Sequence, residues 1–149
     1  STLPQGLEAA EEPPGVRFRT LDEGFAEARS AGRPLLLFFT ADWCPPCHQL
    51  EHEVFRSPKL VKRVEAAYVP VKITDRRRED GENSPEVQDL EDRGSVQAFP
   101  TLLVLRADGI AAVRFVGYAS RGATLSFLQE GIGRLEAAEK RAQAAATKR

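Results

Sequence analysis

The stretch ADWCPPCHQLE, residues 41–51, contains both cysteines of the chain, separated by two prolines and followed at once by a histidine. It comes directly after residues 35–39, an apolar run without polar alternation that is typical of a strand covered on both faces. After the first cysteine, Cys47, Leu50 and Val54 recur at helical spacing. The sequence therefore predicts a buried strand that leads into a helix, with the cysteine pair at the junction.

Further helix and strand patterns lie on either side of this junction. Thr20 and Glu23 form a capping-box pattern at the start of a helix that ends at Gly32, and Asp108-Gly109 is a hairpin signal. By apolar spacing and turn residues, we expect further strands at residues 16–19, 68–73, 101–105 and 110–116, and further helices after the cysteines (interrupted at Ser57-Pro58), at residues 85–93 and at residues 120–135. This order predicts an α/β fold with a central mixed sheet of about four to five strands, flanked by helices on both faces.

The polar and terminal segments divide the chain into three regions. Residues 1–15 are rich in Pro, Glu and small residues and are expected to form a flexible arm or linker. Residues 16–135 contain the predicted elements and form one domain, and residues 136–149 are a helical extension or tail. Within the domain, residues 76–84 (RRREDGENS) are interpreted as a polar loop whose charges face solvent.

Composition narrows the classes of function. The 149 residues are 42% hydrophobic and 29% charged, with a net charge of −1, so no electrostatic argument favours nucleic acid or an anionic membrane surface as a partner. No apolar run approaches the roughly 18 residues that a membrane span needs. Because the chain contains no Met, we expect it to be a processed or excised soluble piece whose leader or membrane part has been removed. We expect a monomer that does not bind nucleic acid.

The cysteine pair allows three kinds of site. A C-x-x-C motif after a buried strand is typical of a redox dithiol. Cys44-Pro-Pro-Cys47-His48 also matches a haem-attachment motif, but the chain has no Met, and His52 lies one turn away on the same helix, where it could not reach the opposite haem face. A structural metal site would need a second pair of ligands, which the sequence lacks. We favour the redox dithiol, with no metal and no bound cofactor besides the cysteines, over these two alternatives and over two idle cysteines.

In the redox interpretation the two cysteines have different roles. Cys44 would be the N-cap of the helix, where its thiolate faces the positive end of the helix dipole and becomes the attacking nucleophile. Cys47 would point inward and resolve the mixed disulfide. Pro45 and Pro46 suit the first helical positions, which need no N–H. Since Pro45 removes a backbone donor near Cys44, we expect a smaller depression of the thiol pKa than the helix end alone would cause.

Residues 41–47, together with Phe99-Pro100-Thr101 before a predicted strand, resemble the active site of the thioredoxin superfamily. Within it, residues 16–135 are most similar to the C-terminal, thioredoxin-like domain of the bacterial transmembrane thiol:disulfide interchange reductase, the DsbD family. The resemblance implies a thioredoxin-like fold in which the peptide bond before Pro100 is cis and lies beside the dithiol. It further implies that the backbone of Phe99 pairs with an extended substrate.

The resemblance also implies a set of site residues. Catalysis would use Cys44, Cys47 and Glu51, the last matching the helix acid of the DsbD domain and serving as a nearby base, although a plain solvated carboxylate explains it equally well. The residues expected to contact substrate are Trp43, Pro45, Phe99, Pro100 and Thr101. The chain departs from the family at position 38, where an acid is usual and Phe38 stands instead. His48 is expected to face solvent near the site, where it could tune the thiolate.

The function implied is that of a thiol:disulfide oxidoreductase. By resemblance it would be a periplasmic disulfide reductase that exchanges electrons with protein thiols and disulfides and receives them from a membrane-embedded donor domain. Two alternatives remain: a free or lipid-anchored thioredoxin-like protein of the cell envelope that acts in cytochrome maturation or repair, and a redox-inactive module that binds extended peptides.

Overall fold

The computed structural model describes residues 15–109 and 112–148 of the chain. Its elements, in chain order, are α2 (Leu21–Ala31), β1 (Leu35–Ala41), α3 (Pro45–Leu50), the π-helix η1 (Glu51–Phe55), α4 (Pro58–Ala67), β2 (Val69–Asp75), α5 (Arg77–Asp80), α6 (Pro85–Arg93), β3 (Thr101–Leu105), β4 (Ala112–Val116) and α7 (Arg121–Thr147). The predicted arm at residues 1–15 lies outside the described residues except for Gly15.

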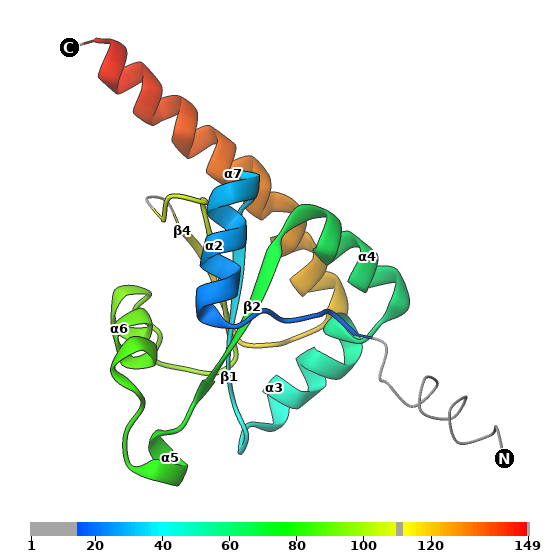
Figure 1. Cartoon of the computed structure of the whole chain (residues 1–149). Helices are drawn as coiled ribbons and strands as arrows, with labels where there is room; N and C mark the ends of the chain where they lie inside the picture. The colour runs from blue at the N-terminus through cyan, green and yellow to red at the C-terminus, as the bar shows by residue number, and fades with distance from the viewer. Residues whose placement is uncertain (1–14, 110–111, 149) are drawn as a thin grey trace, which may run out of the picture.

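The four strands form one mixed sheet in the order β2-β1-β3-β4 (Figure 1). β1 pairs in parallel with β2, starting with Leu35 opposite Val69, and antiparallel with β3. β4 adds an antiparallel edge strand, so the late hairpin reverses direction as the Asp108-Gly109 signal predicts. The predicted mixed α/β sheet is confirmed.

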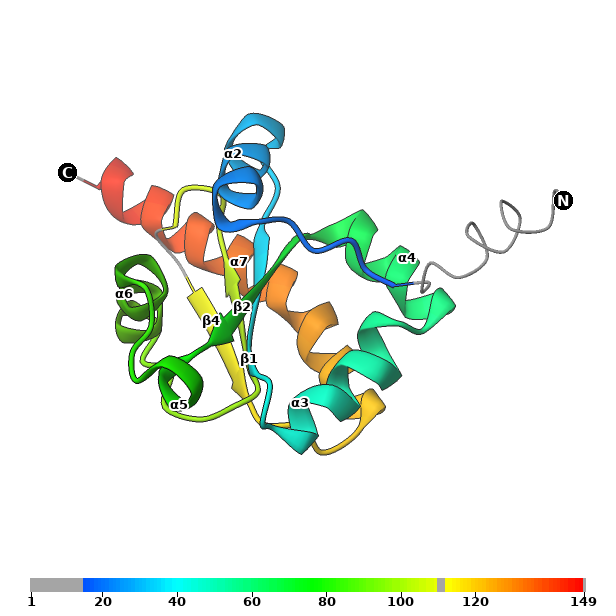
Figure 2. The same cartoon turned by 60° about the horizontal axis from the view of Figure 1, so that its bottom comes forward.

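Helices cover both faces of this sheet (Figure 2), as predicted. On one face, alternate residues of β1 and β3 pack against α3, η1, α4 and α7, and the two cysteines belong to this layer. On the other face, Leu35, Leu37 and Phe39 of β1 pack against β2 and against Ala28 of α2. Every residue of β1 is buried, which explains why its sequence shows no polar alternation.

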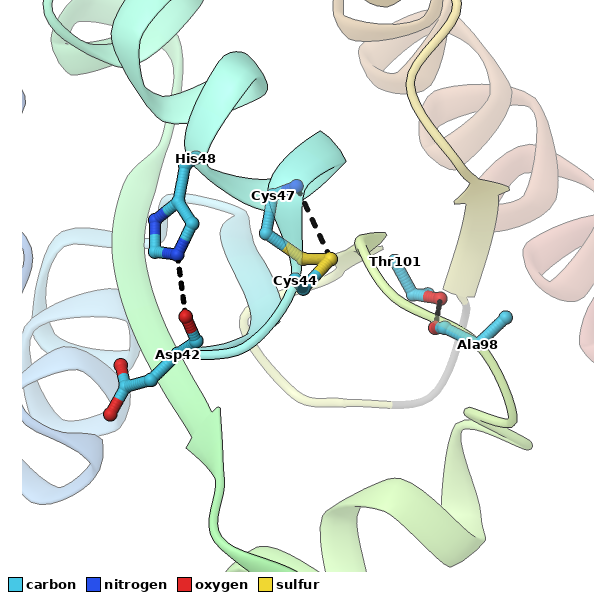
Figure 3. The surroundings of a disulfide bond; sticks show 6 residues. All are labelled: Asp42, Cys44, Cys47, His48, Ala98 and Thr101. Carbon is cyan, nitrogen blue, oxygen red and sulfur yellow. Dashed lines mark hydrogen bonds between the residues drawn. A yellow bond between two sulfur atoms is a disulfide. The ribbon is translucent and has the colours of Figure 1, made fainter. Parts of the chain in front are cut away.

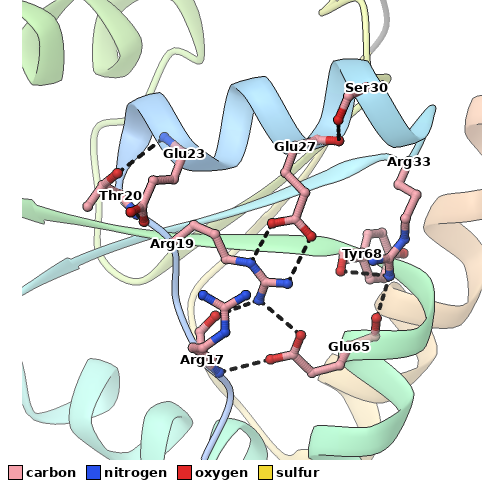
Figure 4. Close-up of polar contacts among 9 residues, drawn as sticks. All are labelled: Arg17, Arg19, Thr20, Glu23, Glu27, Ser30, Arg33, Glu65 and Tyr68. Atoms are coloured by element: carbon pink, nitrogen blue, oxygen red, sulfur yellow. Dashed lines mark hydrogen bonds and ion pairs between the residues drawn. The ribbon is translucent and has the colours of Figure 1, made fainter.

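Residues 16–19 do not form the strand expected from the sequence. In the described part of the chain this segment makes a single β-bridge, between Arg19 and Val71. Arg19 is buried and its guanidinium binds Glu27 of α2 and Glu65 of α4, as Figure 4 shows. The apolar and basic residues therefore do not alternate between core and solvent, because Arg19 points inward to join two helices.

Two other segments differ from the sequence-based expectations. The polar loop at residues 76–84 contains the short helix α5. The helix after the cysteines passes through the π-helix η1, whose wider turn buries the adjacent Val54 and Phe55 together. Residues 136–149 were expected to form a helical extension or a tail, and helix α7 continues through this segment to Thr147. Among the described residues, no helix is both long and apolar enough to cross a membrane.

Candidate active site

The cysteine pair lies where β1 ends and α3 begins. Cys44 is the N-cap of α3 and is joined to Cys47 by a disulfide bond. The backbone N–H of Cys47 donates to the sulfur of Cys44 at 3.3 Å (Figure 3). Pro45 and Pro46 occupy the first two helical positions and have no N–H, so only one early amide of the helix reaches this sulfur. The predicted N-cap geometry is confirmed, and the expected effect of the prolines on the thiol pKa stays a prediction.

Both cysteines are buried in the same core layer. Cys47 is fully buried in the core layer beside Leu50 and Val54, whereas Cys44 is 2% exposed. The neighbouring Trp43 is 39% exposed and is one of the two exposed large hydrophobic residues in the described chain. An exposed indole thus lies next to the buried disulfide.

A second loop, which precedes β3, joins the site from a distant part of the sequence. The Phe99-Pro100 bond is cis, as the resemblance implied. The ring of Phe99 meets that of Trp43 edge to face, with centroids 6.1 Å apart. Thr101 pairs with Phe39 of β1, and its hydroxyl donates to the carbonyl of Ala98 at 2.7 Å (Figure 3). The loop that holds the cis bond thus lies beside the cysteine loop.

Glu51 lies at the end of α3, one turn after Cys47. Its carboxylate forms an ion pair with Lys72 of β2 at 2.9 Å, and no contact joins it to a cysteine sulfur. Its backbone N–H donates to the carbonyl of Cys47. Of the predicted catalytic residues, the structure brings Cys44 and Cys47 together and places Glu51 behind them in an ion pair. Its role as a base stays a prediction.

Phe38 occupies the position where the superfamily carries an acid. Its ring packs against Phe18 and Phe55, with centroids 5.9 Å and 5.1 Å away. Phe38 is also the residue of β1 directly paired with Lys72. Lys72, the neighbour of Phe38 in the sheet, therefore binds the carboxylate of Glu51.

His48 lies on the exposed side of α3 and does not point at the disulfide. Its Nε2 lies 2.7 Å from the backbone carbonyl of Asp42. Since a carbonyl oxygen only accepts, Nε2 carries the proton in this contact, and the imidazole ties the first turn of α3 back to the end of β1.

Two arginines that the sequence analysis placed in a solvated loop contact the site. The guanidinium carbon of Arg78 lies 3.9 Å from the centroid of the Trp43 ring, and Arg76 forms an ion pair with Asp42 at 3.2 Å. The signal that could have found them is their place directly after β2. Parallel strands end at the same edge of a sheet, so the residues after β2 lie near those after β1.

A buried polar cluster lies beneath these arginines. It contains Asp75 at the end of β2, Glu91 of α6 and Asn83, which are 2%, 1% and 8% exposed, and the half-exposed Arg77 binds both carboxylates from its rim. Burial raises the pKa of Glu91 to about 7, and the hydrogen bond with Asp75 and its charge act in the same direction. Burial acts against ionisation of Asp75 as well, but hydrogen bonds from Glu91, Asn83 and Arg77 lower its pKa. Of the two carboxyl groups, Glu91 therefore holds its proton to the higher pH. Among the described residues, no group of three or more His, Cys, Asp or Glu side chains could hold a metal ion.

Comparison with known proteins agrees with this geometry. The thioredoxin-like domain family matches residues 21–132. The thiol:disulfide interchange protein DsbD 1 of Pseudomonas aeruginosa is 34% identical over 90 residues, which are 60% of this chain and 14% of that protein. A thioredoxin from Thermus thermophilus superposes with a TM-score of 0.64 at 26% identity, covering 78% of this chain and 86% of the other. The oxidised C-terminal domain of DsbD from Neisseria meningitidis has the same fold, with a TM-score of 0.57 at 21% identity over 86% of this chain and 95% of that domain.

Four features lead to the same assignment. A buried strand ends at a helix-capping cysteine, a second cysteine follows three residues later, the adjoining loop holds a cis proline, and the family matches most of the chain. The chain belongs to the thioredoxin-like domain family.

Proposed function

We propose that this chain is a thiol:disulfide oxidoreductase that acts as a disulfide reductase in the bacterial periplasm, with Cys44 and Cys47 as its redox centre. The observation that carries the proposal is the buried disulfide at the N-terminus of α3, with Cys44 as the N-cap and Cys47 in the first turn, together with a cis Phe99-Pro100 bond in the adjoining loop. The likeness to DsbD proteins supports the periplasmic location and the reductive direction. The matched stretch spans 14% of that relative, so the activity and partners of the whole relative are only proposed for this chain.

The reaction follows from the positions of the two sulfurs. In the dithiol form, the thiolate of Cys44 attacks one sulfur of a substrate disulfide, and the other substrate sulfur leaves as a thiolate. Cys47 then loses its proton and attacks the sulfur of Cys44, which releases the second substrate thiol and closes the Cys44–Cys47 bond. Two electrons pass to the substrate. A dithiol on a donor protein, in this proposal a membrane-embedded domain, restores the reduced form by the same exchange in reverse.

The remaining predicted residues serve binding and proton transfer in this proposal. The cis bond presents the backbone of Phe99 to an extended substrate, Trp43 and Pro45 contact it at the surface beside Cys44, and the buried Pro100 and Thr101 hold the loop in position. Glu51, one turn behind Cys47, serves as the base for the resolving thiol. No external cofactor takes part, since the cysteine pair itself holds the electrons.

Insulin reduction with dithiothreitol as the electron donor tests the proposed activity. We expect the chain to accelerate the precipitation of insulin, and we expect Cys44→Ser to abolish the acceleration. Cys47→Ser should instead accumulate a mixed disulfide with the substrate, because the resolving thiol is absent. A chain that binds peptides without accelerating precipitation would support the alternative, a redox-inactive peptide-binding module.

The equilibrium reduction potential of the cysteine pair against glutathione tests the proposed direction. A reductase requires a value near that of thioredoxin, about −270 mV, whereas a value near about −120 mV belongs to an oxidant. If insulin reduction is intact but the potential lies in the oxidising range, the protein is an oxidoreductase, and the proposed reductive direction is wrong.

A further inference from the structure

Three consecutive arginines after β2 each bind a different part of the molecule. Arg76 pairs with Asp42 in the cysteine loop and with Asp80 in its own turn. Arg77 turns inward to the buried carboxylates, at 2.9 Å from Asp75 and 3.3 Å from Glu91. Arg78 stacks on Trp43. A run of like charges in the sequence thus becomes three separate contacts, two of which meet residues beside Cys44.

The buried cluster fixes the position of this turn. Asn83 accepts the backbone N–H of Arg76 at 2.7 Å, and its amide nitrogen donates to Asp75 and Glu91 at 3.0 Å and 3.3 Å. The side chain and backbone N–H of Arg77 both donate to Asp75. Because these contacts tie both ends of the turn to β2 and α6, the guanidinium of Arg78 is held over Trp43 by a rigid base.

Arg78 differs from the other two arginines in its free hydrogen-bonding capacity. Within residues 15–109 and 112–148, no carboxylate lies within ion-pair distance of its guanidinium. Stacking on an aromatic ring uses the face of a guanidinium and leaves its N–H edges free, and those edges match the two oxygens of a carboxylate. The neighbouring acids Asp42 and Asp80 are already paired with Arg76.

We propose that Arg78, stacked on Trp43, forms a carboxylate-binding subsite beside the dithiol, so that the protein prefers thiol or disulfide partners with an acidic residue next to the reacting cysteine. The inference rests on the proposed function and adds the chemical class of its substrate. Trp43 lies between Arg78 and Phe99, whose backbone would pair with the substrate strand. A side chain flanking the substrate cysteine therefore passes within reach of the guanidinium.

Two disulfide-linked peptides that differ only by Asp or Asn next to the cysteine test the subsite. Trp43, the single tryptophan of the chain, reports the oxidation of the dithiol form through its fluorescence. We expect the Asp peptide to react about fivefold faster at low ionic strength, the upper end for a solvent-exposed ion pair, and the ratio to fall towards one in high salt. Arg78→Gln should bring the ratio of the two rates to about one, and Arg78→Glu should invert the preference.

Arg29→Gln is the matched control. Arg29 is an exposed arginine in the last turn of α2, at the opposite end of β1 from the cysteines, so this variant should keep the wild-type preference. Equal rates for the two peptides in the wild type, or an unchanged ratio in Arg78→Gln, would overturn the inference.

If neither peptide reacts, the proposed function fails, and binding decides the subsite separately. Peptides with Ser in place of Cys are then titrated calorimetrically into the chain. Tighter binding of the Asp peptide that Arg78→Gln removes would support the subsite, and equal affinities would reject it.

Discussion

At the scale of single residues, the proposed role of Glu51 as a base can be tested by one substitution. It follows Cys47 by one helical turn, and its carboxylate is held by Lys72. If it accepts the proton of the resolving thiol, Glu51→Gln should slow the second exchange step about tenfold near neutral pH, and the deficit should disappear in alkali, where the thiol ionises unaided. The rate of mixed-disulfide resolution as a function of pH measures this.

Lys72→Gln separates this role from a structural one. It breaks the same ion pair but keeps the carboxylate, so it should leave the pH profile of resolution close to that of the wild type. Identical pH profiles for the wild type and Glu51→Gln would mean that Glu51 is a plain surface carboxylate.

The residues of the site differ in how far the sequence predicts them. Cys44 and Cys47 are recognisable because the helix cap, the prolines and the preceding strand are all local in the chain. Pro100 needs the family resemblance, since no local pattern dictates a cis bond. Arg78 and Lys72 are harder to find, because their partners Trp43 and Glu51 lie more than 20 positions away and can be assigned only once the pairing of β1 with β2 is taken into account.

At the scale of elements, α7 depends on close approach to the strands beneath it. A Cβ on Gly131 would lie 2.9 Å from the hydroxyl of Tyr68 and 3.4 Å from a methyl of Val104. That hydroxyl donates to the carbonyl of Leu128 in the same helix, and burial raises the pKa of Tyr68 to about 12. We expect Gly131→Ala to lower the free energy of unfolding by about 1–3 kcal/mol through overpacking, measured by urea denaturation.

Gly133 offers the matched control two residues further along. A Cβ there meets nothing within 4 Å. Gly133→Ala should therefore raise the free energy of unfolding by about 0.5–1 kcal/mol, because alanine favours the helix over the unfolded chain. Equal effects of the two substitutions would show that α7 does not pack closely on Tyr68.

The elements also show where local patterns succeed and fail. The bounds of α6 and β3 agree with the expected ranges, because Ser84-Pro85 and Gly94 delimit the helix and the cis proline precedes the strand. The strand expected at residues 16–19 was wrong because Arg19 binds Glu27 and Glu65, contacts that no alternation pattern encodes. The helix α5 was missed because its polar residues have no apolar face, and it forms where Asp75 and Asn83 bind the flanking backbone.

At the scale of the whole molecule, the buried Asp75–Glu91 pair links stability to pH. The folded state raises the pKa of Glu91 from 4.5 to about 7, so the folded protein binds more protons than the unfolded chain between these values. The stabilisation from this proton is complete below about pH 4.5 and is lost as the pH rises through about 7. Glu91→Gln removes the ionisation and keeps a hydrogen-bonding side chain of the same length.

We therefore expect Glu91→Gln to have wild-type stability near about pH 5 and to exceed it by about 1–3 kcal/mol above about pH 8. Urea denaturation across this range measures the difference. Glu82→Gln, an exposed carboxylate in the same segment, should reproduce the wild-type curve at every pH. A wild-type stability that does not fall between about pH 5 and 8 would contradict a protonated Glu91.

Helix α7 starts close to the loop that holds Pro100, whose carbonyl accepts the N–H of Gly117, and runs away from it for 27 residues (Figure 1). At 1.5 Å per residue its far end is about 40 Å from its start. Its C-terminal part projects beyond the sheet (Figure 1) and is suited to attaching the chain to a surface. Coupling this end of α7 to an electrode or bead would leave the cysteine pair, which lies near the start of the helix, accessible to the surrounding solution.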